Sequence, residues 1–225
     1  MKVICAMNQK GGAGKTTVLL NLMITARAKG RKTTLIDLDP QRSAEKWADL
    51  REIRAKKDEP VIVHALVDEL NDILDEARER KLDLVMIDTP AAIDKTMIYA
   101  AAAADVIVVP TRTSQLDLDA LEETLTTLRN MHALTKAVVV VNAPRTDDKK
   151  GGDIAAVRAL AENGFNVPVA GVVLADSGEI SRALDAGKGI AEKSRSSAAA
   201  KAFATLFDWI DKRGEKPTMR IGRSA

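Results

Sequence analysis

The sequence predicts an α/β protein with a doubly wound, mostly parallel sheet that is flanked by helices. Short apolar runs rich in Val and Ile alternate with longer stretches of helical composition along the chain. The runs are continuous rather than alternating, as expected of parallel strands buried on both faces. A glycine-rich loop follows the first run and opens onto a helical stretch. This β-α-β rhythm favours right-handed crossovers, with ligands at the carboxyl ends of the strands.

The elements are expected to follow one another without a long linker or an internal repeat. Strands are predicted at 2–7, 33–39, 61–65, 82–88, 105–110, 137–142 and 169–174. Helices are predicted at 15–29, 42–57, 67–80, 94–104, 116–134 and 153–163. The length of 225 residues, with 46% apolar residues, suits one domain over 1–213, followed by a flexible basic tail at 214–225.

Composition excludes several classes of function. Aromatic residues make up only 3% of the chain, which argues against a stacking platform for single-stranded bases. Cys5 is the only cysteine, so one chain can form neither a disulfide nor a cysteine metal cluster, and a small buried residue is the simplest interpretation. The first residues are too short an apolar run for a signal peptide, and no run approaches the ~18 apolar residues of a membrane span. A cytoplasmic protein is expected.

Residues 9–17, with the sequence QKGGAGKTT, form an almost complete P-loop signature. Gly14, Lys15 and Thr16 fit the signature, but Gln9 stands where the first glycine is expected. A predicted strand precedes the loop and a predicted helix follows it, which is the context that a P-loop NTPase requires. The residues expected to bind the nucleotide are Gly11, Gly12, Ala13, Gly14, Lys15, Thr16 and Thr17.

Each polar residue of this loop has an expected role. Lys15 reaches the β- and γ-phosphates and is taken as catalytic, Thr16 places its hydroxyl on Mg²⁺, and Thr17 assists at the α-phosphate. The glycines let backbone N–H groups turn toward an anion without a Cβ in the way. A glycine-rich turn that binds nothing is the alternative, and the GKTT sequence in this context argues against it.

Three carboxylates end two of the predicted strands. Asp88 ends the strand at 82–88 and is expected to hold Mg²⁺ through water, as a Walker B acid does. Asp37 and Asp39 end the second strand, and carboxylates two residues apart on a strand face the same side. Either could assist the metal and one could position the attacking water. Each acid alone could be a turn or cap residue, but the three together favour a metal site.

Five segments carry a resemblance to a known family. They are 10–17 (KGGAGKTT), 37–47, 86–90 (MIDTP), 108–121 and 185–206. Together they resemble the deviant Walker A ATPases, and the last two point toward the ParA-type partition ATPases. Because the chain begins at the P-loop strand, it resembles the small ParA subtype, which lacks an N-terminal helix-turn-helix extension. That resemblance implies a protein that is not itself a sequence-specific repressor.

The resemblance implies roles for particular residues. Lys10 matches the signature lysine, which crosses the interface of an ATP-sandwich dimer and touches the phosphates of the partner's nucleotide. Asp39 matches the acid that helps to activate water, with Asp37 beside it as a metal-site residue. Asn142 is placed like the residue that reads adenine, and the segment from Pro110 through Asp117 resembles a dimer-interface region. ATP and Mg²⁺ are the implied cofactors.

A second lysine at one phosphate site also has a physical rationale. The γ-phosphate carries concentrated negative charge, and a lysine from a second subunit would neutralise it, so that dimerisation depends on the nucleotide. Hydrolysis then removes the charge and weakens the dimer. The expected activity is slow hydrolysis of ATP to ADP and phosphate, stimulated by a partner.

The expected partner of the ATP state is double-stranded DNA, bound without sequence preference. From Lys188 onward the chain carries nine basic and four acidic residues. The candidate phosphate contacts are Arg182, Lys188, Lys193, Arg195 and Lys201. A solvated, mixed-charge helical face is the alternative for this region.

The implied role is to segregate or position cargo, as in plasmid or chromosome partition, with the protein on the nucleoid in its ATP state. A small centromere-binding or adaptor protein would stimulate the ATPase. A ParA-like ATPase that positions a protein compartment or cluster uses the same chemistry, and the sequence does not distinguish the cargo.

A membrane-positioning ATPase similar to MinD is a second hypothesis. Phe203, Leu206, Phe207 and Ile210 have the spacing of an apolar helix face. That spacing fits an interfacial helix and fits equally a terminal helix packed on the sheet. A polar tail follows the helix, which makes the membrane the less favoured partner.

A metabolic P-loop enzyme or an iron–sulfur reductase is a third hypothesis. Cys5 alone cannot supply a cluster, even when two subunits share it. No distinct substrate-pocket motif is present, and the isolated His64 and His132 are interpreted as structural.

Overall fold

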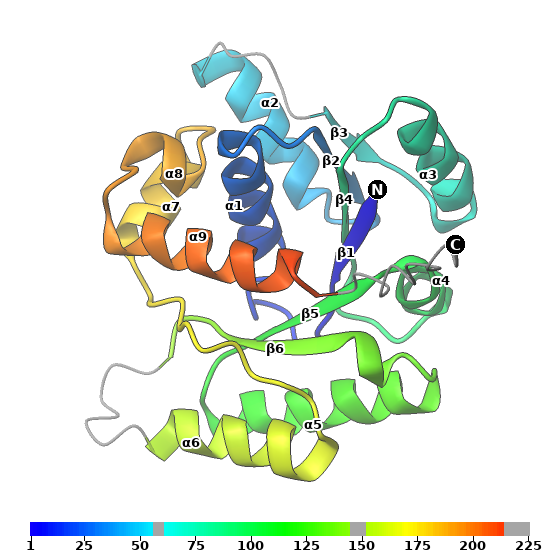
Figure 1. Cartoon of the computed structure of the whole chain (residues 1–225), viewed down its shortest axis with the longest axis vertical. Helices are drawn as coiled ribbons and strands as arrows, with labels where there is room; N and C mark the ends of the chain where they lie inside the picture. The colour runs from blue at the N-terminus through cyan, green and yellow to red at the C-terminus, as the bar shows by residue number, and fades with distance from the viewer. Residues whose placement is uncertain (56–60, 145–151, 214–225) are drawn as a thin grey trace, which may run out of the picture.

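A computed structural model describes residues 1–55, 61–144 and 152–213. Its centre is a six-stranded, fully parallel sheet of order β3-β2-β4-β1-β5-β6 (Figure 1). The strands are β1 (Lys2–Ala6), β2 (Thr33–Asp37), β3 (Val61–His64), β4 (Leu84–Asp88), β5 (Val106–Thr111) and β6 (Ala137–Val141). The predicted doubly wound α/β fold is confirmed. The proposed tail at 214–225 lies outside the described residues.

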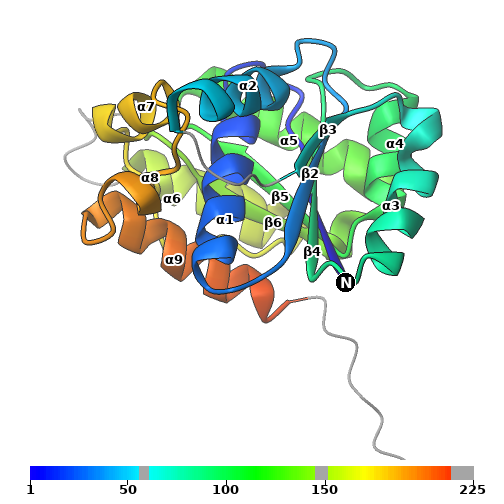
Figure 2. The same ribbon diagram turned by 90° about the horizontal axis from the view of Figure 1, so that it is seen from above.

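Helices cover both faces of the sheet, which Figure 2 shows from above. One face carries α1 (Lys15–Ala28), α2 (Ser43–Ala55), α7 (Gly178–Leu184), α8 (Ile190–Lys193) and α9 (Ala198–Asp211). The other carries α3 (Leu70–Glu79), α4 (Lys95–Ala103), α5 (Gln115–Asn130) and α6 (Gly152–Arg158). Each face has its own apolar cluster, so the strands must be apolar on both sides.

The burial of the strands explains why their sequences are continuous apolar runs. Every residue of β2, β4, β5 and β6 is buried. Neighbouring residues of one strand enter different clusters: Ile4 packs with the α1 face and Cys5 with the opposite face. The expectation that Cys5 is a small buried residue is confirmed.

The terminal helix α9 packs against α1 rather than facing solvent with its apolar side. Its apolar residues Phe203, Leu206, Phe207 and Ile210 are each at most 1% exposed. Because this face is part of the core, α9 does not offer it to a bilayer. None of the described helices is long and apolar enough to cross a membrane.

The run at 169–174 differs from the prediction. It forms only two isolated bridges to β6 and its end, from Val169 to Val139 and from Leu174 to Asn142. Pro168 has no backbone N–H, and the chain bends at Gly171 between the two bridges, so a regular ladder does not form. The helix predicted at 153–163 is also divided, because α6 continues as a π-helix at Ala159–Gly164.

Two of the predicted acids become neighbours in the sheet. Asp37 at the end of β2 lies in register with Asp88 at the end of β4. Asp88 in turn lies in register with Ala6, the last residue of β1. The glycine-rich loop leaves the sheet from β1, so both carboxylates stand beside its root.

Candidate functional site

The glycine-rich loop ends in a backbone conformation that presents the N-terminus of α1. Gly14 is left-handed at φ 96° and serves as the N-cap of α1 without a side chain. A Cβ at Gly14 would lie 2.2 Å from Nδ2 of Asn142, so a larger residue would displace that amide and would also be strained at this φ. The Asn142 amide donates to the carbonyl of Ala13 at 2.9 Å. The first N–H groups of α1 are therefore free of side-chain caps, which makes this end a site for an anion.

The beginning of the loop is fixed by two polar residues. Asn8 is 1% exposed, donates to the Pro110 carbonyl at 2.8 Å and accepts from the Lys10 N–H at 2.7 Å. Gln9 donates through Nε2 to Thr127 Oγ1 on α5 at 2.8 Å. Gln9, in the place of the first glycine, thus attaches the loop to α5. Asn8 is not among the predicted site residues, although a polar residue directly after a buried strand is a signal that the sequence offers.

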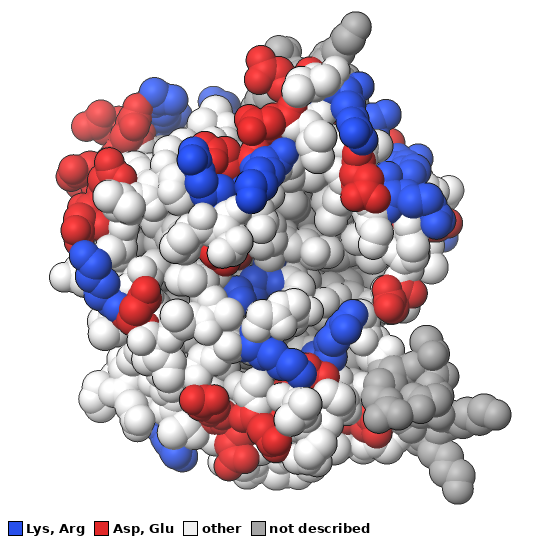
Figure 3. All heavy atoms as spheres, turned by 180° about the vertical axis from the view of Figure 1, so that it is seen from behind, with Lys and Arg blue, Asp and Glu red and all other residues white. Residues whose placement is uncertain are grey.

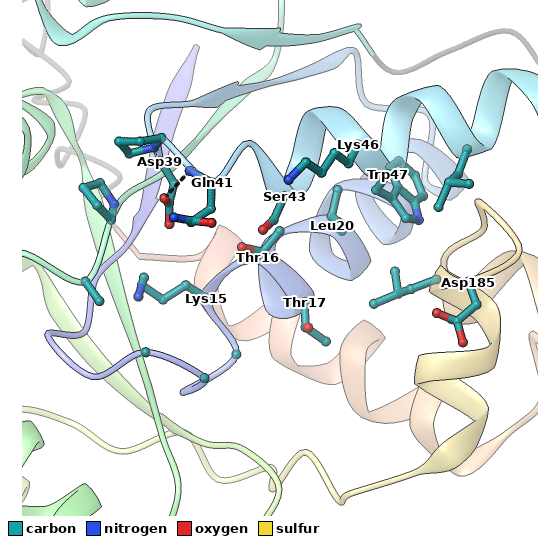
Figure 4. A pocket seen from close by; sticks show the side chains of 18 residues that line it. Lys15, Thr16, Thr17, Leu20, Asp39, Gln41, Ser43, Lys46, Trp47 and Asp185 are labelled. Carbon is teal, nitrogen blue, oxygen red and sulfur yellow. Dashed lines mark hydrogen bonds between the residues drawn. The ribbon is translucent and has the colours of Figure 1, made fainter.

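Lys15 is held inside the cleft that the loop borders (Figure 4). Its ammonium donates to the Asn8 carbonyl at 3.1 Å, and the residue is 8% exposed. Burial lowers the pKa of Lys15, while the nearby carboxylates of Asp88 and Asp39 counteract that shift. A buried ammonium with one carbonyl partner is well suited to accept phosphate oxygens.

Thr16 and Asp88 form the part of the site that fits a metal. Thr16 Oγ1 donates to Asp88 Oδ2 at 2.5 Å, and the other carboxylate oxygen, Oδ1, is buried without a partner among the described residues. Burial, together with repulsion from Asp37 and Asp39, raises the pKa of Asp88 to about 7, against the opposing hydrogen bond from Thr16 and the charge of Lys15. A divalent cation would supply positive charge that stabilises the buried Asp88 carboxylate, so Thr16 and Asp88 fit Mg²⁺.

Asp37 and Asp39 have different surroundings although they are two residues apart. Asp37 is fully buried, and its carboxylate accepts from the N–H of Asp39 at 3.1 Å and from that of Ala44 at 2.9 Å. It therefore fixes the start of α2, and a contact with the metal stays a prediction. Burial raises the pKa of Asp37, mainly against these backbone hydrogen bonds. Asp39 accepts from the Gln41 N–H at 2.8 Å and lines the cleft.

The cleft has a volume of about 790 Å³ and extends from the glycine loop past Asp39 toward α2 and α7. Figure 4 shows Thr16, Thr17, Lys46 and Trp47 among the side chains that line it. The contributions of α2 and α7 were not predicted, because they depend on how those helices pack.

Lys10 lies on the other side of the glycines, in a second cleft of about 420 Å³. Its ammonium is 2.5 Å from Oδ1 of Asp117, whose other oxygen accepts from the N–H and hydroxyl of Ser114. Burial alone would raise the pKa of Asp117, but the hydrogen bonds from Lys10 and Ser114 hold it below its usual range. Lys15 lines the first cleft and Lys10 the second.

The basic residues proposed to contact DNA all lie on α7, α8, α9 and their connections. Arg182, Lys193, Arg195 and Lys201 are exposed, and Lys188 is half-buried. Within the described chain none of them has an ion-pair partner. On the face that Figure 3 shows, Lys and Arg side chains lie among Asp and Glu rather than in one unbroken basic field.

Strand, glycine loop, helix N-terminus, buried lysine and Thr–Asp pair together define a nucleotide-binding protein of the P-loop class. Comparison with protein families agrees, because residues 4–190 match the CobQ/CobB/MinD/ParA nucleotide-binding domain. The chain belongs to this family of P-loop proteins, as its motifs predicted.

Two relatives place the chain near the ParA branch. It is 35% identical over 168 residues to maintenance of carboxysome distribution protein A of Gloeobacter kilaueensis, covering 73% of each chain. It is 30% identical over 155 residues to the chromosome-partitioning ATPase Soj of Thermus thermophilus, covering 58% of this chain and 62% of Soj. Among solved structures, the MinD cell division protein of Aquifex aeolicus has a TM-score of 0.76 at 18% identity, with 94% of this chain and 97% of that chain covered. That likeness confirms the fold.

Proposed function

We propose that this protein is an ATPase that dimerises when it binds ATP, holds duplex DNA without sequence preference in that state, and positions cargo. The observation that carries the proposal is the separation of the two lysines. Lys15 lies in the cleft of its own phosphate loop, whereas Lys10 reaches out of that cleft into another one. A cation at the front of a phosphate loop that does not face its own site could reach the nucleotide of a second subunit once its ion pair with Asp117 opens.

The proposed chemistry assigns one task to each residue of the first cleft. Lys15 and the N-terminus of α1 bind the phosphates of ATP, and Thr16 and Asp88 would hold Mg²⁺, which supplies charge neutralisation at the β- and γ-phosphates. Asp39, exposed to the cleft, orients the attacking water. Asn142 stands at the end of β6 beside the loop, where it could contact the base.

The dimer would make DNA binding depend on ATP. In a two-fold symmetric dimer each subunit presents its own copies of α7, α8 and α9, so the number of phosphate contacts doubles. Each copy carries the five cations named above, which lack ion-pair partners within the described chain. Release of the γ-phosphate would remove the negative charge that attracts Lys10 of the other subunit. The dimer would then dissociate, and the DNA-binding surface formed by two subunits would be lost. The protein would then act in the cytoplasm and on the nucleoid.

The names of the relatives support two kinds of cargo. Soj of Thermus thermophilus is described as a chromosome-partitioning ATPase. The relative from Gloeobacter kilaueensis is described as maintaining carboxysome distribution, and a second relative with that description comes from Halothiobacillus neapolitanus. Positioning of a protein compartment is therefore a second candidate beside DNA partition. In both cases a small adaptor or centromere-binding protein would stimulate hydrolysis. Membrane positioning is less favoured, because the apolar face of α9 is buried.

The test is a mobility shift on random-sequence duplex DNA with ATP, with ADP and without nucleotide, repeated over a range of salt concentrations. We expect a shift with ATP alone, and an affinity that falls steeply with salt, as phosphate contacts require. Equal binding in the three nucleotide states, or none, would contradict the DNA proposal. Lys10→Ala is the matched variant: it should bind ATP and lose the shift.

A further inference from the structure

A buried arginine connects α2 with the turn between α7 and α8. The guanidinium of Arg51 donates to both carboxylate oxygens of Glu192, at 2.8 and 2.9 Å, and to the Gly187 carbonyl at 3.1 Å. One helical turn later, Arg54 donates to the carbonyl of Asp185. Residues 185–193, which we call the α7–α8 segment, are thus held by two arginines of one helix.

The backbones of α2 and the α7–α8 segment also touch directly. Gly187 is left-handed at φ 66°, and a Cβ at this position would lie 2.5 Å from the Cα of Arg51. Arg51 is 2% exposed and lies over the ring of Trp47, 5.4 Å from its centroid. Contacts this close leave the segment little freedom to move independently of α2.

The other end of α2 begins at the nucleotide cleft. Asp37 accepts from the first N–H groups of the helix, and Asp39 and Gln41 in the preceding turn line the cleft. Helix α2 has 13 residues, a length of about 20 Å, and it behaves as a rigid rod over that distance. Trp47, beneath Arg51, lines the same cleft.

We propose that Arg51 is a positioning residue, which transmits the nucleotide state at the start of α2 to the α7–α8 segment through Glu192. This inference rests on the proposed function, because Lys188 and Lys193 of that segment are two of the proposed DNA contacts. Residues 39–41 of the turn before α2 line the cleft. If the γ-phosphate binds beside them, as the proposed function requires, their surroundings change when that phosphate binds or leaves. A shift of α2 then moves the α7–α8 segment with it.

Two substitutions test the connection between Arg51 and Glu192. One keeps the charge of the protein and the other removes a negative charge, so a shared effect cannot come from charge alone. Arg51→Lys keeps the charge but removes the planar fork that binds both oxygens of Glu192. Glu192→Gln makes the protein more positive, so simple electrostatics predicts tighter DNA binding in every nucleotide state. The controls are Arg80→Lys and Glu76→Gln, which alter an exposed ion pair between α3 and the residue that caps its C-terminus.

The measured quantity is the ratio of DNA affinity with ATP to that with ADP, with nucleotide affinity measured on the same samples. Wild type and both controls should keep a large ratio. Arg51→Lys and Glu192→Gln should each lower it by about fivefold or more, the usual size of coupling between sites, with nucleotide affinity unchanged. For Glu192→Gln, the change of charge alone would tighten binding in every nucleotide state and leave the ratio unchanged, so a lower ratio reports the lost connection.

Two results would overturn the inference. One is a ratio at the wild-type level in both variants. The other is an equal loss of nucleotide and DNA affinity, which would show a merely structural role. The ratio of DNA affinities with ATP and with ADP is measured first for the wild-type protein. A wild-type ratio of one would refute the proposed function itself. A large wild-type ratio that both variants keep would refute only the connection through Arg51.

Discussion

Asp117 holds the signature lysine in its own subunit, and its replacement should make dimerisation easier. In the structure Lys10 Nζ lies 2.5 Å from Asp117 Oδ1, with 33% of the lysine side chain and 6% of the aspartate side chain exposed. If Lys10 must reach the partner's nucleotide, this ion pair has to break first. Asp117→Asn removes the charge and keeps an oxygen that can accept from Ser114 at the start of α5.

The size of the effect follows from exposure and symmetry. A hydrogen bond between charged groups stabilises a protein more than a fully exposed ion pair does. Because the Lys10 side chain is a third exposed, we assign about 1 kcal/mol of stabilisation to each Lys10–Asp117 pair. A symmetric dimer breaks two such pairs, or about 2 kcal/mol, which corresponds to about thirtyfold in the dimer dissociation constant. Because the pKa of Asp117 is held below its usual range, the pair is lost only as the pH falls through that lowered value, and it is intact at neutral pH.

The assay is sedimentation equilibrium at neutral pH with a non-hydrolysable ATP analogue. Asp117→Asn should dimerise at about thirtyfold lower protein concentration than wild type. The matched control is Asp119→Asn, an exposed carboxylate on the same helix that accepts a hydrogen bond from Gln115 rather than from a lysine. If Asp117→Asn dimerises no better than the control while still binding nucleotide, Asp117 does not restrain Lys10.

Three further predictions concern the residues of the two clefts. Lys15→Ala should abolish nucleotide binding, whereas Lys10→Ala should bind nucleotide like wild type and fail to dimerise on ATP. Titration with a fluorescent nucleotide measures the binding, and sedimentation measures the dimer. An ATP dimer of the Lys10 variant would contradict the sandwich arrangement. Asp39→Ala should accumulate the ATP dimer because water is no longer oriented, and phosphate release faster than wild type would exclude this role. The raised pKa of Asp88, about 7, means that its contribution to the stability of the nucleotide-free protein is present in acid and lost as the pH rises through about 7. Asp88→Asn should remove that loss, which is on the order of 4 kcal/mol, from denaturation curves measured without Mg²⁺; an unchanged pH dependence would show that another group is responsible.

The sheet was predictable because a strand that is buried on both faces has a continuous run of apolar residues. All six strands of the described sheet coincide with apolar runs that the sequence predicted as strands. The run at 169–174 shows the limit of this signal. An apolar run reports burial, which Leu174 has, but pairing also needs backbone N–H groups in register, and Pro168 and Gly171 interrupt them.

The site was predictable where residues end strands and unpredictable where it depends on distant packing. Asp37 and Asp88 are found together because parallel strands end at one edge of the sheet. Nothing local in the sequence couples Lys10 to Asp117, which is 107 residues away and reaches it only because α5 starts beside the loop. Arg51 and Glu192 are likewise joined only by the packing of α2 against α8.

The departure from the P-loop signature acquires a structural reason from these contacts. Gln9, in the place of the first glycine, binds α5, and Asp117 stands near the start of that same helix. The front of the loop is therefore attached to α5, while its end, from Gly14, begins α1. A glycine at position 9 would lose the side-chain bonds to the Glu123 carbonyl and Thr127 Oγ1 and keep only the backbone N–H bond to Thr124 Oγ1. Gln9 and Asp117 thus attach the front of the loop to α5 and direct Lys10 into the second cleft, away from Lys15, as the proposed use of two lysines for two nucleotides requires.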